Sequence, residues 1–289
     1  MANILAVGIA TVDIINVVDG YPREDVKVRA QTQHVYRGGN ATNTLSVLSQ
    51  LGHQCYWAGV YVNEPDSAHI LNDLKAHQID IANCRVETTG KSPTSYVTLN
   101  QQNASRTIVH YRDLPEFSFI DFEKIDLASF DWIHFEGRNI AETLKMVMFT
   151  RQHYPNLPIS IEVEKARPEI EKLWMQSVDV LFFSKAFAKK QGFDNAADFL
   201  PAMRKQNTTT PLFCAWGAKG ASVLDMDNQL HYVPARPIKK VVDTLGAGDT
   251  FNAGVIHSLC TQQDLPHALN FANQLAGKKC EQLGLKNLL

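Results

Sequence analysis

Hydrophobic residues along the chain gather in short apolar runs that are separated by longer amphipathic segments. The runs lie at residues 4–9, 132–135, 159–163, 178–183 and 212–216. They are short, almost wholly apolar and often β-branched, which is typical of strands buried on both faces of a parallel sheet. We therefore predict that each of these runs is a central strand.

The segments between the runs carry apolar residues at helical spacing. Leu45, Leu48 and Leu51, for example, fall on one face of a helix. We predict three such helices, at residues 41–51, 251–260 and 266–283. The alternation of strands and helices predicts an α/β protein with a doubly wound, mostly parallel sheet, whose ligands bind at the carboxyl ends of the strands.

Residues 12–36 and 84–111 break this rhythm, because their apolar and polar residues alternate one by one. Such alternation is typical of antiparallel strands with one face in water. We expect the two insertions to pair into a small β-sheet that forms a lid over the cleft. The sequence shows no linker, repeat or low-complexity segment, so we expect residues 1–289 to form a single domain that carries this lid.

Composition and charge narrow the function classes. The 289 residues are 45% hydrophobic and 20% charged, which is ordinary for a soluble domain. A net charge of −2 offers no basic surface for nucleic acid or for an anionic membrane. The N-terminal apolar run is too short for a signal peptide or a membrane span. Five cysteines without a Cys-x-x-Cys pair indicate free thiols in a reducing, cytoplasmic environment.

The most informative motif is the glycine-rich turn at residues 243–250, directly before a predicted helix. Gly246, Ala247 and Gly248 leave the first backbone amides of that helix uncovered, and the helix dipole adds positive charge, so a phosphate group suits this turn. Asp249 would repel a phosphate unless its carboxylate faces a substrate hydroxyl instead. That arrangement is typical of a kinase that phosphorylates small alcohols.

The alternative is a purely structural turn in which Asp249 caps the following helix. The spacing excludes two other phosphate-binding motifs. The chain has no Gly-x-x-x-x-Gly-Lys-Ser/Thr run of a P-loop, and Gly246-Ala-Gly248 lacks the third glycine of a dinucleotide-binding fingerprint.

Residues 37–43 (Arg-Gly-Gly-Asn-Ala-Thr-Asn) and residues 243–250, about two hundred positions apart, resemble the paired signatures of the ribokinase family of sugar and nucleoside kinases. The resemblance is strongest to members that phosphorylate ketohexoses such as fructose, and it extends from the first strand to residues 278–280. Further similar stretches lie at residues 19–25, 105–108, 133–139, 161–165, 213–216 and 242–253. The resemblance implies a ribokinase-like fold and transfer of the γ-phosphate of ATP to the C1 hydroxyl of a ketohexose.

Carried over to this sequence, the resemblance makes Asp249 the catalytic base that takes the proton from the attacking hydroxyl. An ordinary Asp pKa near ~3.9 would leave this group ionised at neutral pH. The amides of Gly246, Ala247 and Gly248 would hold the transferred phosphoryl group, and Arg106 would reach it from the lid. The alternative for Arg106 is a solvated surface arginine.

The sugar-binding positions implied by the resemblance are Asp13, Gly38, Gly39, Asn40 and Asn43. A carboxylate and carboxamides can satisfy several sugar hydroxyls, while glycines let the sugar approach the backbone. In the structural alternative, Asn40 caps the helix that follows it and the two glycines only form a turn.

The adenosine site implied by the resemblance consists of Ala215, Trp216, Gly217, Gly220, Asn273 and Cys280, with Lys185 supplying charge to the phosphates. ATP should arrive with Mg²⁺, which prefers phosphate oxygens, water and carboxylates. The resemblance also implies a monovalent cation, potassium (K⁺) in relatives, at Asp243; the alternative there is a carboxylate that braces the loop. A homodimer through the β-sheet lid is expected on the same resemblance.

Two stretches depart from the family pattern. Related ketohexose kinases tend to carry acidic residues where this chain has Gly217-Ala-Lys219, which leaves the nucleotide preference open, and residues 184–188 lack the Asn-x-x-Glu motif that helps to organise Mg²⁺ in the wider family. Glu164, acting through water, is a candidate replacement. Glu136 and Arg138 are expected to order the floor of the cleft through an ion pair.

Two rival functions stay open on the sequence. One is a kinase of the same family that acts on another sugar or on a nucleoside. The other is a sugar or nucleotide sensor that kept the fold and lost the chemistry, although retention of Asp249 argues against it.

Overall fold

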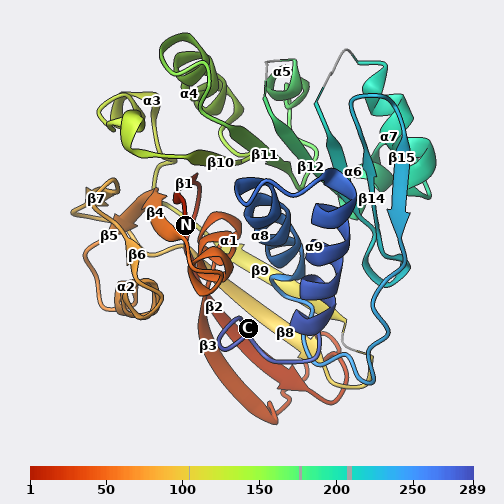
Figure 1. The fold of residues 1–289 in the computed structure, drawn as a ribbon. Coiled ribbons are helices and arrows are strands. Elements are labelled where there is room, and N and C mark those ends of the chain that lie inside the picture. The colour runs from red at the N-terminus through yellow and green to blue at the C-terminus, as the bar shows by residue number, and fades with distance from the viewer. Residues whose placement is uncertain (104, 176–177, 207–209) are drawn as a thin grey trace.

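The computed structural model describes residues 1–103, 105–175, 178–206 and 210–289. Within this part of the chain, nine strands form one large sheet (Figure 1). Their order across the sheet is β15 (Leu230–Val233), β14 (Ala221–Leu224), β13 (Leu212–Ala215), β12 (Val180–Ser184), β11 (Ile159–Val163), β10 (Trp132–Glu136), β1 (Asn3–Val7), β4 (Gln54–Ala58) and β6 (Ile79–Asp80). Neighbouring strands are parallel from β6 to β13, whereas β14 and β15 add an antiparallel edge. The predicted doubly wound, mostly parallel sheet is confirmed.

Helices cover both faces of this sheet, and β1 shows why. Side chains of a strand alternate between its two faces. Ile4 and Ala6 belong to a hydrophobic core that also contains side chains from α1 (Asn40–Gln50), α2 (Ser67–Ala76), α8 (Ala247–Cys260) and α9 (Leu265–Lys279). Leu5 and Val7 belong to a second core, with side chains from α3 (Phe119–Phe122), α4 (Ile140–His153), α5 (Glu171–Trp174), α6 (Lys185–Lys190) and α7 (Ala196–Arg204). The near-continuous apolar character of β1 follows from burial on both faces.

The two insertions predicted from the sequence pair into a second, four-stranded sheet. Its strand order is β3 (Thr32–Gly38), β2 (Thr11–Val18), β8 (Thr94–Asn100) and β9 (Arg106–Tyr111). The expectation of antiparallel pairing holds for β2–β3 and β8–β9, but β2 and β8 run parallel. These two strands come from different insertions, so no tight turn forces them into opposite directions.

The second insertion contributes to more than this sheet. Its first strand, β7 (Arg85–Glu87), pairs instead with β5 (Val60–Val62). Residue 104, between β8 and β9, lies outside the described part of the chain. The small sheet packs a minor apolar cluster of Ile15, Val97 and Leu99 against Leu245 of the glycine-rich turn. The sheet and the turn are therefore in direct contact.

The boundaries of several elements differ from the sequence-based expectation. The strand predicted to end at residue 9 ends at Val7, and the helix predicted to begin at residue 251 begins at Ala247. Residues 238–242, which precede the glycine-rich turn, form no hydrogen-bonded strand. The chain enters the turn as an irregular segment because the last strand before it, β15, is the edge of the large sheet and ends at Val233.

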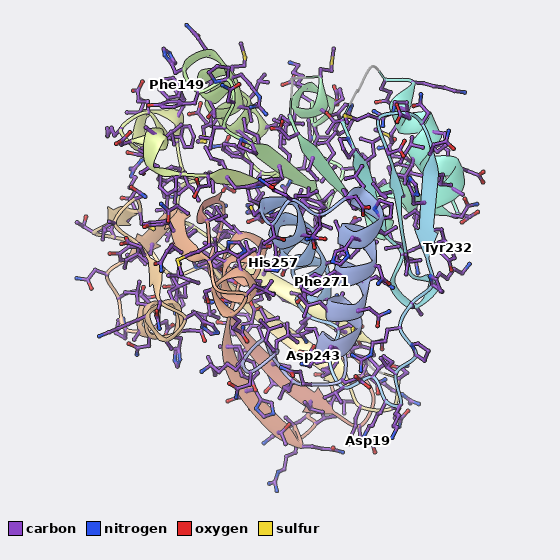
Figure 2. The ribbon with its side chains drawn as sticks, viewed as in Figure 1. Asp19, Phe149, Tyr232, Asp243, His257 and Phe271 are labelled. Atoms are coloured by element: carbon purple, nitrogen blue, oxygen red, sulfur yellow. The ribbon has the colours of Figure 1, made fainter. Side chains whose placement is uncertain are left out.

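Helices α8 and α9 pack against each other on the face of the sheet that carries α1 (Figure 1). Figure 2 shows His257 of α8 beside Phe271 of α9, whose ring centroids are 5.4 Å apart. Asp243 lies near the far end of this helix pair, in the segment that leads into α8. Two short 3₁₀ helices, η1 (Leu127–Ser129) and η2 (Gly217–Lys219), complete the described secondary structure.

All five cysteines are free thiols, as their spacing predicted. Among the described residues, the helices are too short or too polar to cross a lipid bilayer.

Candidate active site

Helices α1 and α8 bring together two residues that are about two hundred positions apart in the sequence. Asn43, in the first turn of α1, donates a hydrogen bond from Nδ2 to Oδ2 of Asp249 in α8, at 2.7 Å. The Oδ1 atom of Asn43 accepts a hydrogen bond from Nη1 of Arg37 at 2.8 Å. The Asn43 carboxamide is therefore held between a guanidinium and the Asp249 carboxyl group.

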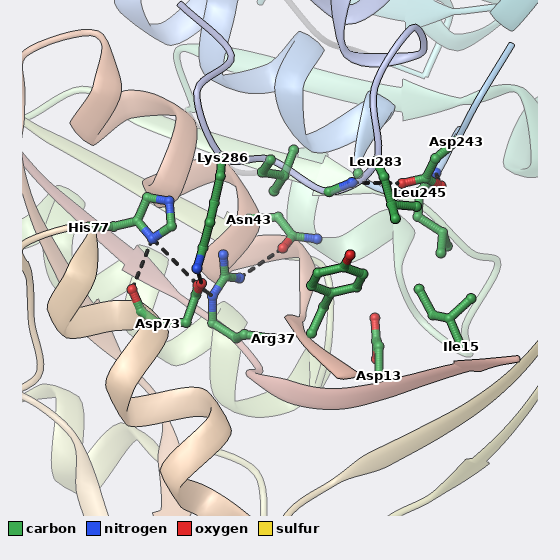
Figure 3. A pocket seen from close by; sticks show the side chains of 14 residues that line it. Asp13, Ile15, Arg37, Asn43, Asp73, His77, Asp243, Leu245, Leu283 and Lys286 are labelled. Atoms are coloured by element: carbon green, nitrogen blue, oxygen red, sulfur yellow. Dashed lines mark hydrogen bonds and ion pairs between the residues drawn. The ribbon is translucent and has the colours of Figure 1, made fainter. Parts of the chain in front are cut away.

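Arg37 is itself fixed on all sides. Its Nε lies 2.6 Å from Oδ2 of Asp73 (Figure 3). Its remaining nitrogens donate to the hydroxyl groups of Thr42 and Ser46. Only 7% of Arg37 is exposed. The sequence analysis quoted Arg37 within the Arg-Gly-Gly-Asn run but gave it no role. In the structure it is the residue that fixes the orientation of Asn43 and, through Asn43, of Asp249.

Asp249 is buried, with 6% of its surface exposed. Burial raises the pKa of its carboxyl group to about 7; the Asn43 hydrogen bond opposes this rise, and the charges of Glu164 and Glu136 add to it. The expectation of an ordinary Asp pKa is therefore wrong, because a sequence motif does not report how far a group is removed from water. The carboxyl group changes its protonation state close to neutral pH.

The glycine-rich turn ends where α8 begins. Gly246 takes the left-handed conformation at the N-cap position, with φ 76°, and no side chain of the described residues caps the helix. A Cβ atom at Gly248 would meet nothing within 4 Å, so the space beside this residue is open. The Ala247 amide already donates to the Thr244 carbonyl oxygen, at 3.3 Å. Asp249 does not act as the cap, since the N-cap residue is Gly246.

Two cavities flank this turn. One, of about 200 Å³, is lined by residues that include Asp13, Asn43 and Gly246 (Figure 3). The other, of about 640 Å³, is lined by residues that include Arg106, Ala247 and Gly248. Asp249 lines neither cavity itself, but its hydrogen-bond partner Asn43 lines the first and its chain neighbour Gly248 lines the second.

The predicted sugar-binding residues at the end of β3 lie against β2. Asp13 accepts a hydrogen bond from the hydroxyl group of Thr11 at 2.7 Å, and burial raises the pKa of its carboxyl group. A Cβ atom at Gly38 would lie 2.0 Å from Oδ2 of Asp13, and one at Gly39, where φ is 103°, would lie 2.1 Å from a backbone oxygen of Ile9. Only glycine fits at these two positions. Gly38 ends β3 and Gly39 is the N-cap residue of α1, and their lack of side chains leaves room for the Asp13 carboxyl group and the Ile9 backbone.

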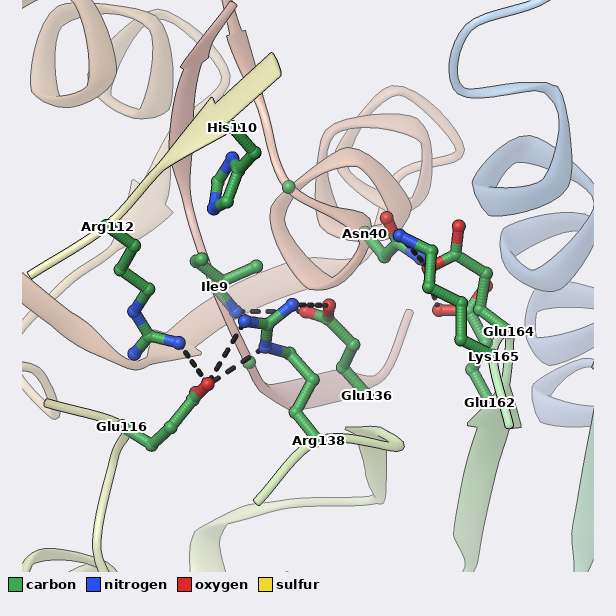
Figure 4. A network of polar contacts seen from close by, with 12 residues as sticks. Ile9, Asn40, His110, Arg112, Glu116, Glu136, Arg138, Glu162, Glu164 and Lys165 are labelled. Carbon is green, nitrogen blue, oxygen red and sulfur yellow. Dashed lines mark hydrogen bonds and ion pairs between the residues drawn. The ribbon is translucent and has the colours of Figure 1, made fainter. Parts of the chain in front are cut away.

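Asn40 does not cap α1, because the N-cap residue is Gly39. Its Nδ2 atom instead donates to Oε2 of Glu162 at 3.0 Å (Figure 4). Glu162 is a buried residue one position before the end of β11, and it lines the larger cavity. Burial, followed by the nearby charge of Asp249, raises the pKa of Glu162 well above its ordinary value. The sequence analysis missed Glu162, whose only signal was a charged residue inside an apolar strand.

An ion-pair network orders the floor of the cleft, as expected for Glu136 and Arg138. Glu136 accepts a hydrogen bond from the backbone amide of Ile9 at 3.0 Å and lies 3.5 Å from Nη1 of Arg138 (Figure 4). Arg138 also pairs with Glu116 at 3.0 Å. These contacts hold the end of β1 against β10, so they position the backbone that borders Gly39.

Arg106 reaches the glycine-rich turn from β9. Its Nη1 atom donates to the hydroxyl oxygen of Thr244 at 2.6 Å, and its side chain lines the larger cavity. Arg106 is exposed, yet it is tied to the turn by this hydrogen bond. The small sheet contacts the turn twice, through this hydrogen bond and through Leu245.

Most residues predicted for the nucleotide line the larger cavity. They are Lys185, Ala215, Gly217, Gly220, Asn273 and Cys280. Trp216 is the exception: it is 4% exposed and belongs to the core on the far face of the sheet. Consecutive residues at the end of a strand point to opposite faces, so a run that includes Ala215 and Trp216 cannot place both side chains in one cavity.

Two amide side chains of the larger cavity differ in their contacts. Nδ2 of Asn273 donates to the backbone oxygen of Pro234 at 2.7 Å, so this residue also fixes the segment after β15. Asn252, which the sequence analysis missed, lies one turn into α8 and is 4% exposed. Its Nδ2 atom has no hydrogen-bond partner within the described part of the chain. A buried unpaired donor is costly, so Asn252 is a candidate contact for a bound polar group.

The structure places Asp243, the predicted potassium ligand, in an ion pair. Oδ2 of this buried carboxylate lies 2.6 Å from the ammonium group of Lys279, and Oδ1 accepts a hydrogen bond from the Leu245 amide at 2.8 Å. These contacts brace the loop that leads into α8.

Comparison with known proteins agrees with this geometry. Residues 1–289 match the family described as pfkB family carbohydrate kinase. The chain belongs to this family. It is 41% identical to mouse ketohexokinase over 294 aligned residues, which cover 99% of this chain and 98% of the relative.

Solved structures of family members share the fold. A Cryptococcus neoformans ribokinase in complex with ADP superposes with a TM-score of 0.83 at 16% identity, covering 100% of this chain and 96% of that one. An Arabidopsis thaliana ribokinase complexed with ribose and ATP gives a TM-score of 0.80 at 18% identity, covering 98% and 94%. The predicted ribokinase-like fold is confirmed. As a pfkB carbohydrate kinase, the protein is a phosphotransferase with an alcohol group as acceptor.

The burial of Asp249 predicts how stability depends on pH. The folded protein holds a proton on Asp249 up to a pH of about 7, while the unfolded chain releases it near 3.8. The unfolded state therefore gains stability as pH rises from about 4 to 7, and folding loses on the order of 4 kcal/mol across that window. Asp249→Asn should remove this loss, so its free energy of unfolding should exceed that of the wild type progressively from pH 4 to 7.

Denaturant unfolding of both proteins at several pH values measures this difference. Asp227→Asn, at an exposed turn, is the matched control and should shift the curve little. A constant offset between Asp249→Asn and the wild type from pH 4 to 8 would contradict the assignment of a raised pKa.

Proposed function

We propose that the protein is an ATP-dependent ketohexokinase, which transfers the γ-phosphate of ATP to the C1 hydroxyl of fructose or a related ketohexose. One observation carries the proposal. The Asp249 carboxyl group accepts a hydrogen bond from Asn43, which lines the smaller cavity, and follows Gly248, which lines the larger one, in the first turn of α8, where no side chain of the described residues caps the helix. The 41% identity to mouse ketohexokinase over nearly the whole chain supports the choice of substrate class.

In this proposal, ionised Asp249 accepts the proton of the C1 hydroxyl as that oxygen bonds to the γ-phosphorus. The bond between the γ-phosphorus and the oxygen that bridges to the β-phosphate breaks, and ADP leaves with the electron pair. The amides near Gly246 and Gly248, together with the helix dipole, stabilise negative charge on the transferred group. Asn43 keeps the carboxyl group aimed at the hydroxyl, because its own amide is fixed by Arg37.

The smaller cavity suits the sugar and the larger one suits the nucleotide. Asp13 and Asn43 line the smaller cavity and offer polar groups to hydroxyls, whereas Asn40 donates to Glu162, which lines the larger one. The larger cavity has an apolar wall for a base, with Phe182, Phe213 and Phe251 among its residues, and Lys185 at the start of α6 for phosphates. Its volume of about 640 Å³ is within the ordinary range for a ligand of this size.

Mg²⁺ is part of this proposal. The buried Glu162 lines the larger cavity near the end of β11, the half-exposed Glu164 follows that strand, and carboxylates with water are ligands that Mg²⁺ accepts. Bound there with the phosphates, the ion would neutralise charge on them. Addition of EDTA in excess of Mg²⁺ should abolish turnover.

The most direct test measures ADP release with ATP over a panel of ketoses, aldoses and nucleosides. We expect fructose or another ketohexose to have the highest kcat/KM. Preference for ribose or a nucleoside would instead support a related kinase, and tight sugar binding without product would support a sensor.

Asp249→Asn should lower kcat by about 10²–10⁴-fold with sugar affinity largely kept, since it removes only the base. Normal turnover in this variant would refute its role.

Arg106 provides a second test. If its guanidinium stabilises the transferred phosphoryl group, Arg106→Ala should lower kcat by about 10²-fold or more and change KM for the sugar much less. Thr244→Val is the matched control, because it removes the hydrogen bond seen at 2.6 Å and keeps the guanidinium. Equal losses in kcat and affinity, or an equal effect of Thr244→Val, would assign Arg106 to ground-state binding or to holding the turn.

The homodimer remains a proposal, and the small sheet supports it. Val35, Ile14, Tyr96 and Val109 form a row across β3, β2, β8 and β9, and Val109 is 66% exposed. An apolar row on a sheet face suits a second copy of the same chain. Val109→Lys should shift the protein to a monomer in light scattering, whereas Ile120→Lys, at an exposed position on α3, should not. A wild-type monomer at micromolar concentration would contradict the proposal.

We also propose a cytoplasmic location. Five free thiols, four of them within or packed against the buried cores, support a reducing compartment. Microscopy of a tagged full-length protein would check this.

A further inference from the structure

Lys279 is a fully buried lysine, with 0% of its surface exposed, in the last turn of α9. Removal of an ammonium group from water is costly unless it is paired and hydrogen-bonded. Nζ of Lys279 donates to Oδ2 of Asp243 at 2.6 Å and to the backbone oxygen of Asp243 at 3.0 Å. Both contacts therefore fall on the residue that begins the glycine-rich turn.

Asp243 already pairs with a cation. Besides Lys279, its carboxylate accepts hydrogen bonds from the backbone amides of Leu245 at 2.8 Å and Gly284 at 3.2 Å. All of these partners are donors with positive or partly positive charge. A potassium ion bound to this carboxylate would lie beside an ammonium group that already pairs with it, and the two like charges would repel, so the residues present do not fit it.

The ammonium group acts where the proposed chemistry occurs. Asp243 is three residues before Gly246, and the Leu245 amide bound to its Oδ1 is the link between them. Burial lowers the pKa of the Lys279 ammonium group, and the charge of Asp243 opposes this change. One buried cation thus fixes the path of the turn that leads to Asp249.

We propose that Lys279 is the built-in monovalent cation of this site, a tethered ammonium that replaces an exchangeable potassium ion. Lys279 is then a positioning residue: it acts on the phosphoryl-binding turn through Asp243. This inference rests on the proposed kinase function, and it predicts that turnover needs no added potassium. Removal of the ammonium group should create a vacant site that a small external cation can fill.

The first experiment measures wild-type turnover with fructose and MgATP in sodium, potassium and choline chloride at equal ionic strength. We expect rates within about twofold of one another, because the cation is covalently held. A rate that falls more than about tenfold without potassium would overturn the inference. Absence of turnover in every salt would instead refute the proposed function, so the two failures are distinguishable.

The second experiment uses Lys279→Ala, with Lys278→Ala, an exposed neighbour in the same helix, as the matched control. We expect Lys279→Ala to lose about 10²-fold in kcat, the scale of a small misplacement of catalytic groups. Ammonium, methylammonium or potassium ions at tens of millimolar should restore at least about tenfold. Lys278→Ala should keep wild-type turnover and show no such rescue.

Thermal unfolding, which does not depend on turnover, tests whether Lys279 replaces a bound cation or only stabilises the fold. The same cations should raise the melting temperature of Lys279→Ala more than choline does, and they should leave the wild type and Lys278→Ala unchanged. If Lys279→Ala does not fold, the neutral pair Asp243→Asn with Lys279→Met replaces it. That double variant should fold and show neither high turnover nor rescue by any cation. Full turnover in the double variant, or a Lys279→Ala protein that no cation rescues or stabilises, would overturn the inference.

Discussion

The burial of the Asp249 carboxyl group is the constraint on which the rest of the structure depends. Only 6% of the surface of Asp249 is exposed to solvent. The charged form of a carboxyl group buried in this way is unfavourable unless nearby groups stabilise the charge. Asn43 donates to it, and Arg37 holds Asn43. Burial nevertheless prevails, and the pKa of Asp249 rises to about 7. The site therefore keeps a base that is strong enough to accept a proton and still ionises near neutral pH.

The same burial explains why so many charges surround the cleft in pairs. Glu136 lies against Arg138 and the Ile9 amide, Glu162 accepts from Asn40, and Asp243 lies against Lys279. A buried charge without a partner would destabilise the fold by several kcal/mol, on the order of 3–5 for a broken buried pair. Each pair also fixes one backbone segment of the site. The residues that neutralise the buried charges therefore also position the backbone of the site.

The small sheet and the glycine-rich turn are held together by direct contacts. Leu245 packs against the apolar cluster of the sheet, and Arg106 donates to Thr244. A movement of the small sheet would therefore displace the residues at the start of α8, where the phosphoryl group is proposed to bind. This coupling depends on contacts between segments that are more than one hundred positions apart in the sequence. Family membership, shown by the match over residues 1–289, is consistent with such an arrangement.

The sequence by itself determined the fold class, a doubly wound and mostly parallel sheet, because short apolar runs are a local property. It also singled out the glycine-rich turn and the candidate site residues Asp249, Asn43 and Arg106, because glycine spacing and motifs are local as well. Only the tertiary structure decided the protonation of Asp249, the ion pair of Lys279 with Asp243 and the place of Trp216 in the core. Those features depend on burial and on partners from distant segments. No local pattern records the distance of a side chain from water, and that distance sets the chemistry of this site.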